Sequence, residues 1–146
     1  MAKTFRADFS PALTPKEMLE LGVFGGWYFE GRHDEYPKSW FAKAKTSSDG
    51  FDVGLNCFGV AAGLSRTEWQ AKGWITRDDP LGWFQWYCRY SLGRRLPDVD
   101  DFQIARWHAF GPRHIGGIRK NCEPGDIACR RRQRQALLQW GYDPFF

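Results

Sequence analysis

The segment WFQWYCRYSLGRR, residues 83–95, constrains the fold more than any other part of the chain, because it carries five aromatic rings between Trp83 and Tyr90. On a helical wheel the rings and aliphatic residues occupy one broad arc, and the polar Gln85 and Arg89 share the remaining strip. A helix that is apolar around most of its circumference is normally buried. We therefore predict that this segment is the central core helix. The alternative is a surface on which nucleobases stack, which requires exposed rings.

The length of the chain indicates one domain. A domain of 146 residues buries roughly 70% of the surface that its unfolded chain exposes. Aromatic residues make up 17% of the chain and include 8 Trp, which is well above the usual share. We therefore predict a single globular domain over residues 1–146 with a core built largely of rings, and an extended N-terminal arm over residues 1–12.

Capping residues, prolines at helix starts and glycines at helix ends recur along the sequence. They predict a compact all-α domain of five or six short helices. The predicted helices run from Thr14–Pro15 to Gly22, over 37–45, from Ser65 to Gly73, from Asp79 to Gly93, from Asp98 to Gly111–Pro112, as a weaker turn over 113–121, and from Asp126 to Gly141.

The N-terminal third leaves room for a minor β element. Its glycine-rich passage GVFGGWYFEGRHDEYP is too interrupted for a long helix, and a short strand or turn is expected around 27–29. The stretch FDVGLNCFGV, residues 51–60, is compatible with a strand or an ordered loop.

Positive charge is concentrated in the C-terminal part of the chain. Residues 1–88 contain 10 Lys and Arg against 11 Asp and Glu, whereas residues 89–146 contain 11 against 6. Such asymmetry indicates an anionic partner such as nucleic acid or phosphate. The alternative is a solvated face, or arginines paired with the acids Asp98, Asp100 and Asp101.

We therefore predict a nucleic-acid-binding domain whose arginines contact the phosphates of DNA or RNA, while Gln85 and Arg89 reach a base or the backbone. The residues predicted to bind nucleic acid are Gln85, Arg89, Arg94, Arg95, Arg106, Arg113, Arg119, Lys120, Arg130, Arg131 and Arg134. A protein-interaction or homodimerisation module that uses exposed rings is one alternative.

A small enzyme acting on a nucleotide or a nucleic-acid base is the other alternative. An aromatic pocket would hold the base, and the loop residues His33, Asp34 and Glu35 are the candidates for proton transfer. Adjacent loop residues often point in different directions, so an exposed turn is the commoner arrangement. The sequence contains no nucleophile-elbow, P-loop, zinc-protease or deaminase motif.

The chain contains four cysteines, Cys57, Cys88, Cys122 and Cys129. None shows C-x-x-C spacing, and we expect free thiols, the default in a reducing compartment. A disulfide between Cys122 and Cys129 is the alternative if the chain folds back. Zinc ligation by this pair with His108 and His114 does not match familiar zinc spacings. We therefore predict no metal and no cofactor.

The N-terminus MAKTFRADFS has no apolar stretch that could serve as a signal peptide. No apolar run is long enough to cross a bilayer. We therefore expect an intracellular protein without a membrane partner, which is cytoplasmic, or in the nucleoid or nucleus if it binds DNA.

Several motifs resemble those of a family of uncharacterised small proteins from bacteria, fungi and plants. They are LGVFGGWY, LNCFGV, KGWI, DDPLGWFQWYCRY, GRR, NCEPGDIACRRRQRQALLQW and the closing GYD, and they extend from Leu21 to Asp143. The resemblance implies one intact domain in which the aromatic helix and the segment from Cys122 to Trp140 belong to the same fold. It implies no activity.

Overall fold

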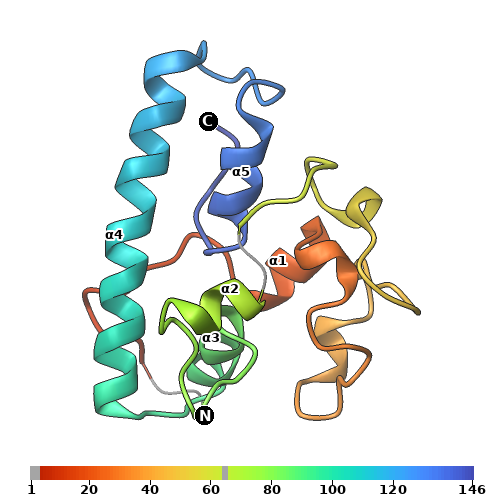
Figure 1. Cartoon of the computed structure of the whole chain (residues 1–146), viewed down its shortest axis with the longest axis vertical. Coiled ribbons are helices and arrows are strands. Elements are labelled where there is room, and N and C mark those ends of the chain that lie inside the picture. Colours follow the sequence, from red (N-terminus) through yellow and green to blue (C-terminus); the bar gives the residue numbers. More distant parts are fainter. Residues whose placement is uncertain (1–3, 64–65) are drawn as a thin grey trace.

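The computed structural model describes residues 4–63 and 66–146 (Figure 1). The regular structure in these residues is helical without any strand, so the predicted all-α class is confirmed and the minor β element is not found there. Figure 1 shows one long helix, α4, along one side of the molecule with α5 beside it. The helices are α1 (Pro15–Leu21), α2 (Arg66–Ala71), α3 (Trp83–Ser91), α4 (Pro97–Asn121) and α5 (Arg131–Leu138), with 3₁₀ turns at Phe24–Gly26, Lys38–Trp40 and Val53–Leu55.

Helix α1 follows the signals in its sequence. The Thr14 side chain accepts a hydrogen bond from the Glu17 N–H, and the Glu17 carboxylate accepts one from the Thr14 N–H, which forms a capping box. Gly22 follows the last turn with a φ of 111°, a region that favours glycine. A Cβ at this position would also overlap the carbonyl oxygen of Leu55.

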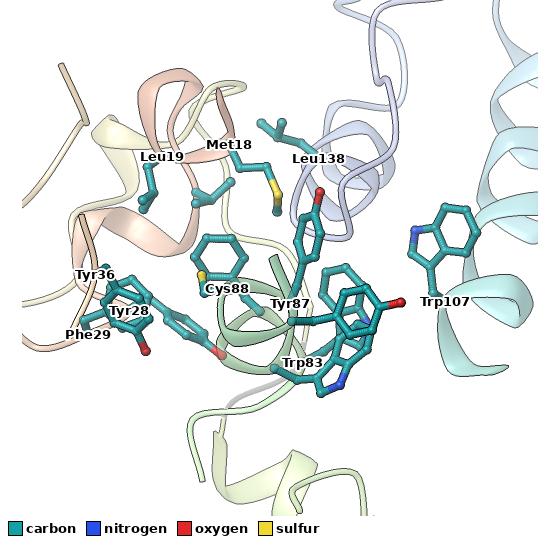
Figure 2. Packing of buried hydrophobic residues seen from close by; sticks show 14 of the residues in the cluster. Met18, Leu19, Tyr28, Phe29, Tyr36, Trp83, Tyr87, Cys88, Trp107 and Leu138 are labelled. Carbon is teal, nitrogen blue, oxygen red and sulfur yellow. The ribbon is translucent and has the colours of Figure 1, made fainter. Parts of the chain in front are cut away.

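Helix α3 lies at the centre of the hydrophobic core, as predicted. Its side chains Trp86, Cys88 and Tyr90 are 0% exposed, and Figure 2 shows α3 between side chains of α1 and α4. Phe9, from the irregular N-terminal segment, packs on Trp86 and Tyr90 with ring centroids 5.3 and 5.5 Å apart. The predicted arm is therefore anchored in the core through Phe9, and the rings of α3 are too buried to be a stacking platform.

The start of α3 differs from the prediction. The helix begins at Trp83, and its N-cap is Gly82 with a φ of 110°, so Asp79 is not the cap. Asp79 is 0% exposed, and its carboxylate accepts hydrogen bonds from Arg89 and Arg94 at 3.0 and 2.7 Å. The Asp79 carboxylate therefore makes charge-assisted hydrogen bonds to two guanidinium groups instead of bonding to the N–H groups at the start of the helix.

Helix α4 continues through Gly111 and Pro112, where the sequence predicts its end. Pro112 removes one backbone hydrogen bond, and its ring lies on the exposed side of the helix. Gly111 packs directly against the ring of Tyr142, which stacks on Trp107 with centroids 4.7 Å apart. Tertiary packing therefore overrides two local stop signals, and the predicted separate turn over 113–121 is the last part of α4.

Replacing Gly111 by alanine is expected to lower the free energy of unfolding by about 3 kcal/mol. The new Cβ would overlap the Tyr142 ring, which cannot retreat because it stacks on Trp107 and its hydroxyl donates a hydrogen bond to the Trp107 carbonyl. Urea denaturation followed by circular dichroism measures the change.

The matched control is Gly116→Ala in the same helix, where the added Cβ meets nothing within 4 Å. Alanine has the higher helix propensity, so this variant is expected to gain about 0.5–1 kcal/mol. Equal denaturation midpoints for the Gly111 and Gly116 variants would contradict the packing argument.

The segment between α4 and α5 is closed by a disulfide between Cys122 and Cys129, whose Cα atoms lie 5.8 Å apart. The expectation of free thiols is wrong for this pair and holds for Cys57 and Cys88. The disulfide removes both thiolates from the zinc site considered above. In residues 4–63 and 66–146 no group of three His, Cys, Asp or Glu side chains is placed to hold a metal ion.

Helix α5 begins at Arg131, whereas the sequence predicts a start at Asp126. Arg130, the residue before the helix, has a left-handed conformation with a φ of 58°. A left-handed residue interrupts a right-handed helix, so the turn that contains Asp126 stays separate from α5. Gly141, the predicted stop, has a φ of 75° and follows the helix.

Two other helix predictions differ from the structure. The predicted helix over 37–45 is reduced to the 3₁₀ turn Lys38–Trp40, and α2 ends at Ala71, before the predicted stop at Gly73. Ser65, the predicted cap of α2, lies outside the described residues. No helix of the described part has both the length and the apolar character needed to cross a membrane.

Candidate functional site

A cavity of about 550 Å³ lies between α4, α5, the start of α3 and the α2 segment. This volume is within the range of small-molecule sites, which are mostly apolar with a few polar groups. The cavity has that character, because rings dominate its wall. Its aromatic residues include Phe24, Trp69, Trp74, Trp83, Phe110 and Trp140.

Two helix faces form much of the cavity wall. On α4 the lining side chains recur every three or four residues from Arg106 to His114, and on α5 and its C-cap they do so from Arg132 to Gln139. Residues at this spacing share one face of a helix. The α4 stripe exists only because the helix continues past Gly111. The predicted helix end at that glycine therefore hid the stripe in the sequence.

Stacked rings connect the two helix faces. The Trp140 ring lies 4.8 Å from the Trp83 ring and 4.7 Å from the Phe110 ring, with an interplanar angle of 16° to Phe110. Phe110 in turn lies 4.3 Å from the His114 imidazole. A planar ligand group can extend such a stack.

Arg106 places a positive charge among these rings. Its guanidinium lies 5.1 and 5.2 Å from the ring centroids of Trp74 and Trp140. It donates hydrogen bonds of 3.0 Å to the Trp74 carbonyl and to Gln103 Oε1. Burial lowers the pKa of Arg106 to about 10, which leaves the group charged at neutral pH.

No carboxylate of the described residues pairs with Arg106. A partly buried cation without a counter-charge is costly to a fold. Groups whose charge the fold leaves uncompensated are typical of binding and catalytic sites. Hydrogen bonds and ring contacts satisfy Arg106 in part, and its charge leaves it able to bind an anionic or hydrogen-bond-accepting group in the cavity.

A second polar region surrounds His114, about 12 Å from Arg106 along the α4 axis. Burial, and secondarily the charge of Arg113, lowers the pKa of His114, so the imidazole is neutral at neutral pH. Its Nδ1 lies 3.4 Å from Gln133 Nε2. The Oε1 atom of Gln133 is buried and has no hydrogen-bond partner in the described part of the chain.

Exposed cations continue from this end of the cavity. Arg113 and Arg132 line it and are exposed, and four more cations are exposed near the adjacent ends of α4 and α5. None of the six pairs with a carboxylate of the described residues. We call this set the basic surface. It consists of Arg113, Arg119, Lys120, Arg130, Arg131 and Arg132.

Two members of the basic surface make contacts within the chain. The Arg119 guanidinium lies 5.4 Å from the centroid of the Phe146 ring. Arg131 donates a hydrogen bond of 3.4 Å to the carbonyl of Phe58. Both side chains are nevertheless exposed and keep most of their donors free for a ligand.

The other predicted nucleic-acid-binding residues are occupied inside the fold. Arg89 donates two hydrogen bonds to Glu35, at 2.6 and 2.8 Å, and one to Asp79. The Arg89 guanidinium lowers the pKa of the Glu35 carboxyl. Arg94 shares the buried Asp79. This network fixes the loop that precedes α3, and it lies outside the cavity.

Gln85, Arg95 and Arg134 are also internal. The Gln85 side chain is buried and accepts a hydrogen bond of 2.9 Å from the Leu81 N–H. The Arg95 guanidinium lies 3.6 Å from the centroid of the Tyr90 ring. Arg134 is 0% exposed, so it cannot touch a phosphate. The prediction for Arg134 is corrected for that reason.

The candidates for proton transfer do not converge. The His33 ring stacks on Phe41 with centroids 4.0 Å apart, and burial lowers its pKa. Glu35 faces Arg89, and Asp34 is exposed. None of the three lines the cavity.

No protein-family model matches the chain, and no match is found among curated proteins or among solved structures. The resemblance noted from the motifs therefore stays a prediction. The site is assigned from its geometry.

Proposed function

We propose that the protein binds a nucleotide in this cavity, either free or as part of a nucleic acid. The base lies among the rings near Arg106, and the phosphate lies at Arg113 and Arg132. The observation that carries the proposal is Arg106 itself, a partly buried guanidinium in a ring-lined cavity with no carboxylate partner among the described residues.

The chemistry of a nucleotide matches both ends of the cavity. A base has flat faces for stacking and keto oxygens or ring nitrogens that accept hydrogen bonds from a guanidinium. A phosphate supplies the anion for the exposed arginines at the other end.

Binding fits the site better than catalysis does. The enzyme alternative needs a carboxylate inside the aromatic pocket, and the described lining residues include none. The His114 imidazole lies against Phe110 and next to Gln133 Nε2, so we assign it a stacking and hydrogen-bonding role.

Titration with nucleoside monophosphates tests the proposal. Trp69, Trp74, Trp83 and Trp140 line the cavity, so a stacked base is expected to quench tryptophan fluorescence. The matching nucleoside, which lacks the phosphate, and ribose 5-phosphate, which lacks the base, should each bind at least about tenfold more weakly.

The result that overturns the proposal is the absence of any fluorescence or calorimetric response to all four monophosphates. Equal affinity for ribose 5-phosphate and for a nucleotide would overturn it too, because the rings would then have no part in recognition.

A further inference from the structure

We propose that the nucleotide in the cavity belongs to a single-stranded nucleic acid, whose neighbouring phosphates lie on the basic surface. This inference rests on the proposed function, because it takes the cavity to be a base site. It adds the class of partner, which is a polymer rather than a free metabolite.

The fold holds the two halves of the basic surface together. Arg119 and Lys120 lie just before Cys122, and Arg130 follows Cys129 directly. The disulfide keeps the Cα atoms of these cysteines 5.8 Å apart, so the chain ends that follow α4 and precede α5 are held close together. The backbone segments that carry the basic surface are therefore fixed relative to one another by the disulfide.

The basic surface extends beyond the reach of one phosphate. Arg119 and Lys120 lie about 9–11 Å beyond Arg113 along the α4 axis. A free nucleotide engages the cations at the cavity mouth and leaves the others without an anion. A strand that enters the cavity with one base carries its next phosphates over the remaining cations. Glu123 and Asp126 lie in the same connection, and the cations outnumber them.

The cavity selects a single strand over a duplex. A base in a duplex is stacked and paired, so it reaches a pocket only after it is extruded from the helix, which costs energy. Bases of a single strand are already accessible to aromatic side chains. The ring-lined cavity therefore complements an unpaired base, and the arginines of the basic surface complement its backbone.

The test compares a mononucleotide with single-stranded DNA and RNA oligonucleotides of about twelve nucleotides, and with the corresponding duplexes, by fluorescence anisotropy and tryptophan quenching. The oligonucleotide should bind at least about tenfold more tightly than the mononucleotide. Its affinity should fall more steeply with salt, by about 0.7 in log–log slope for each additional phosphate contact.

The double variant Lys120→Gln/Arg130→Gln isolates the basic surface, because neither residue lines the cavity. It should reduce the salt slope for the oligonucleotide by about 1.4 and leave mononucleotide binding unchanged. The matched control is Lys38→Gln/Lys43→Gln, two exposed lysines in the N-terminal half, which should change neither.

Each contrary outcome points to a different failure. If the mononucleotide binds but the oligonucleotide binds no more tightly, the inference is overturned and the proposed function stands. If neither ligand binds, the proposed function fails and the inference fails with it. Duplex binding as tight as single-strand binding overturns the inference. So does oligonucleotide binding that Arg106→Met leaves unchanged, because the basic surface would then act without the cavity.

Discussion

Replacing Arg134 by methionine is expected to lower the free energy of unfolding by about 4 kcal/mol. The guanidinium is 0% exposed, and every hydrogen bond that it donates goes to a main-chain oxygen. The acceptors are the oxygens of Asp126, Cys129, Pro144 and Phe146, at distances of 2.6 to 3.0 Å. Methionine fills much of the volume but removes all four hydrogen bonds. The Asp126 oxygen keeps the Cys129 N–H as a donor, whereas the bond to the Pro144 oxygen is lost in a buried position.

The measurement is urea denaturation of the two variants Arg134→Met and Arg132→Met under oxidising conditions. Arg132 is exposed and nearby in the same helix, so its replacement should change stability by less than about 0.5 kcal/mol. A similar small loss in both variants would mean that the hydrogen bonds of Arg134 do not stabilise the C-terminal segment.

The burial of Arg134 also explains why it was wrongly predicted to bind nucleic acid. The sequence presents it inside the run RRRQRQ, and charged residues are almost never fully buried without partners. Its partners are backbone oxygens from the disulfide-closed turn and from the C-terminal segment. Backbone acceptors in irregular segments leave no residue-type signal, so pattern reasoning places such an arginine on the surface.

The sequence correctly predicted those features of the helices that depend only on residues close together in the chain. The capping box of α1 needs only Thr14 and Glu17, which are three residues apart, and the buried character of α3 follows from its own ring content. The path of α4 depends instead on Tyr142, which lies far along the chain and packs on Gly111. Long-range contacts of this kind have no local sequence signature.

The sequence did not predict the cavity, because the cavity also depends on contacts between residues far apart in the chain. The prediction included Arg106 and Arg113 for their charge, but it missed His114, Arg132 and Gln133 as partners in one site. The repeat of lining residues along α4 would have been visible at a spacing of three and four residues. That spacing applies only if the helix is taken to continue through its Gly–Pro pair.

Replacing Arg106 by methionine is expected to weaken nucleotide binding by about thirtyfold, equivalent to about 2 kcal/mol. Its guanidinium is the positive charge among the rings of Trp74 and Trp140, so the variant keeps the apolar wall and loses the donor for the base. Tryptophan quenching by a mononucleotide measures the change. Arg106→Lys, which keeps a charge without the planar fork, should bind with intermediate affinity.

The free energy of unfolding should change much less in Arg106→Met than in Arg134→Met. Arg106 is charged, partly buried and without a carboxylate partner in the described residues, and burial disfavours that charge. Methionine removes the desolvated charge along with two hydrogen bonds. The free energy of unfolding without ligand should therefore stay within about 1 kcal/mol of the parent protein. A loss as large as that of Arg134→Met, with nucleotide affinity intact, would make Arg106 a structural residue and would remove the main support for the proposed site.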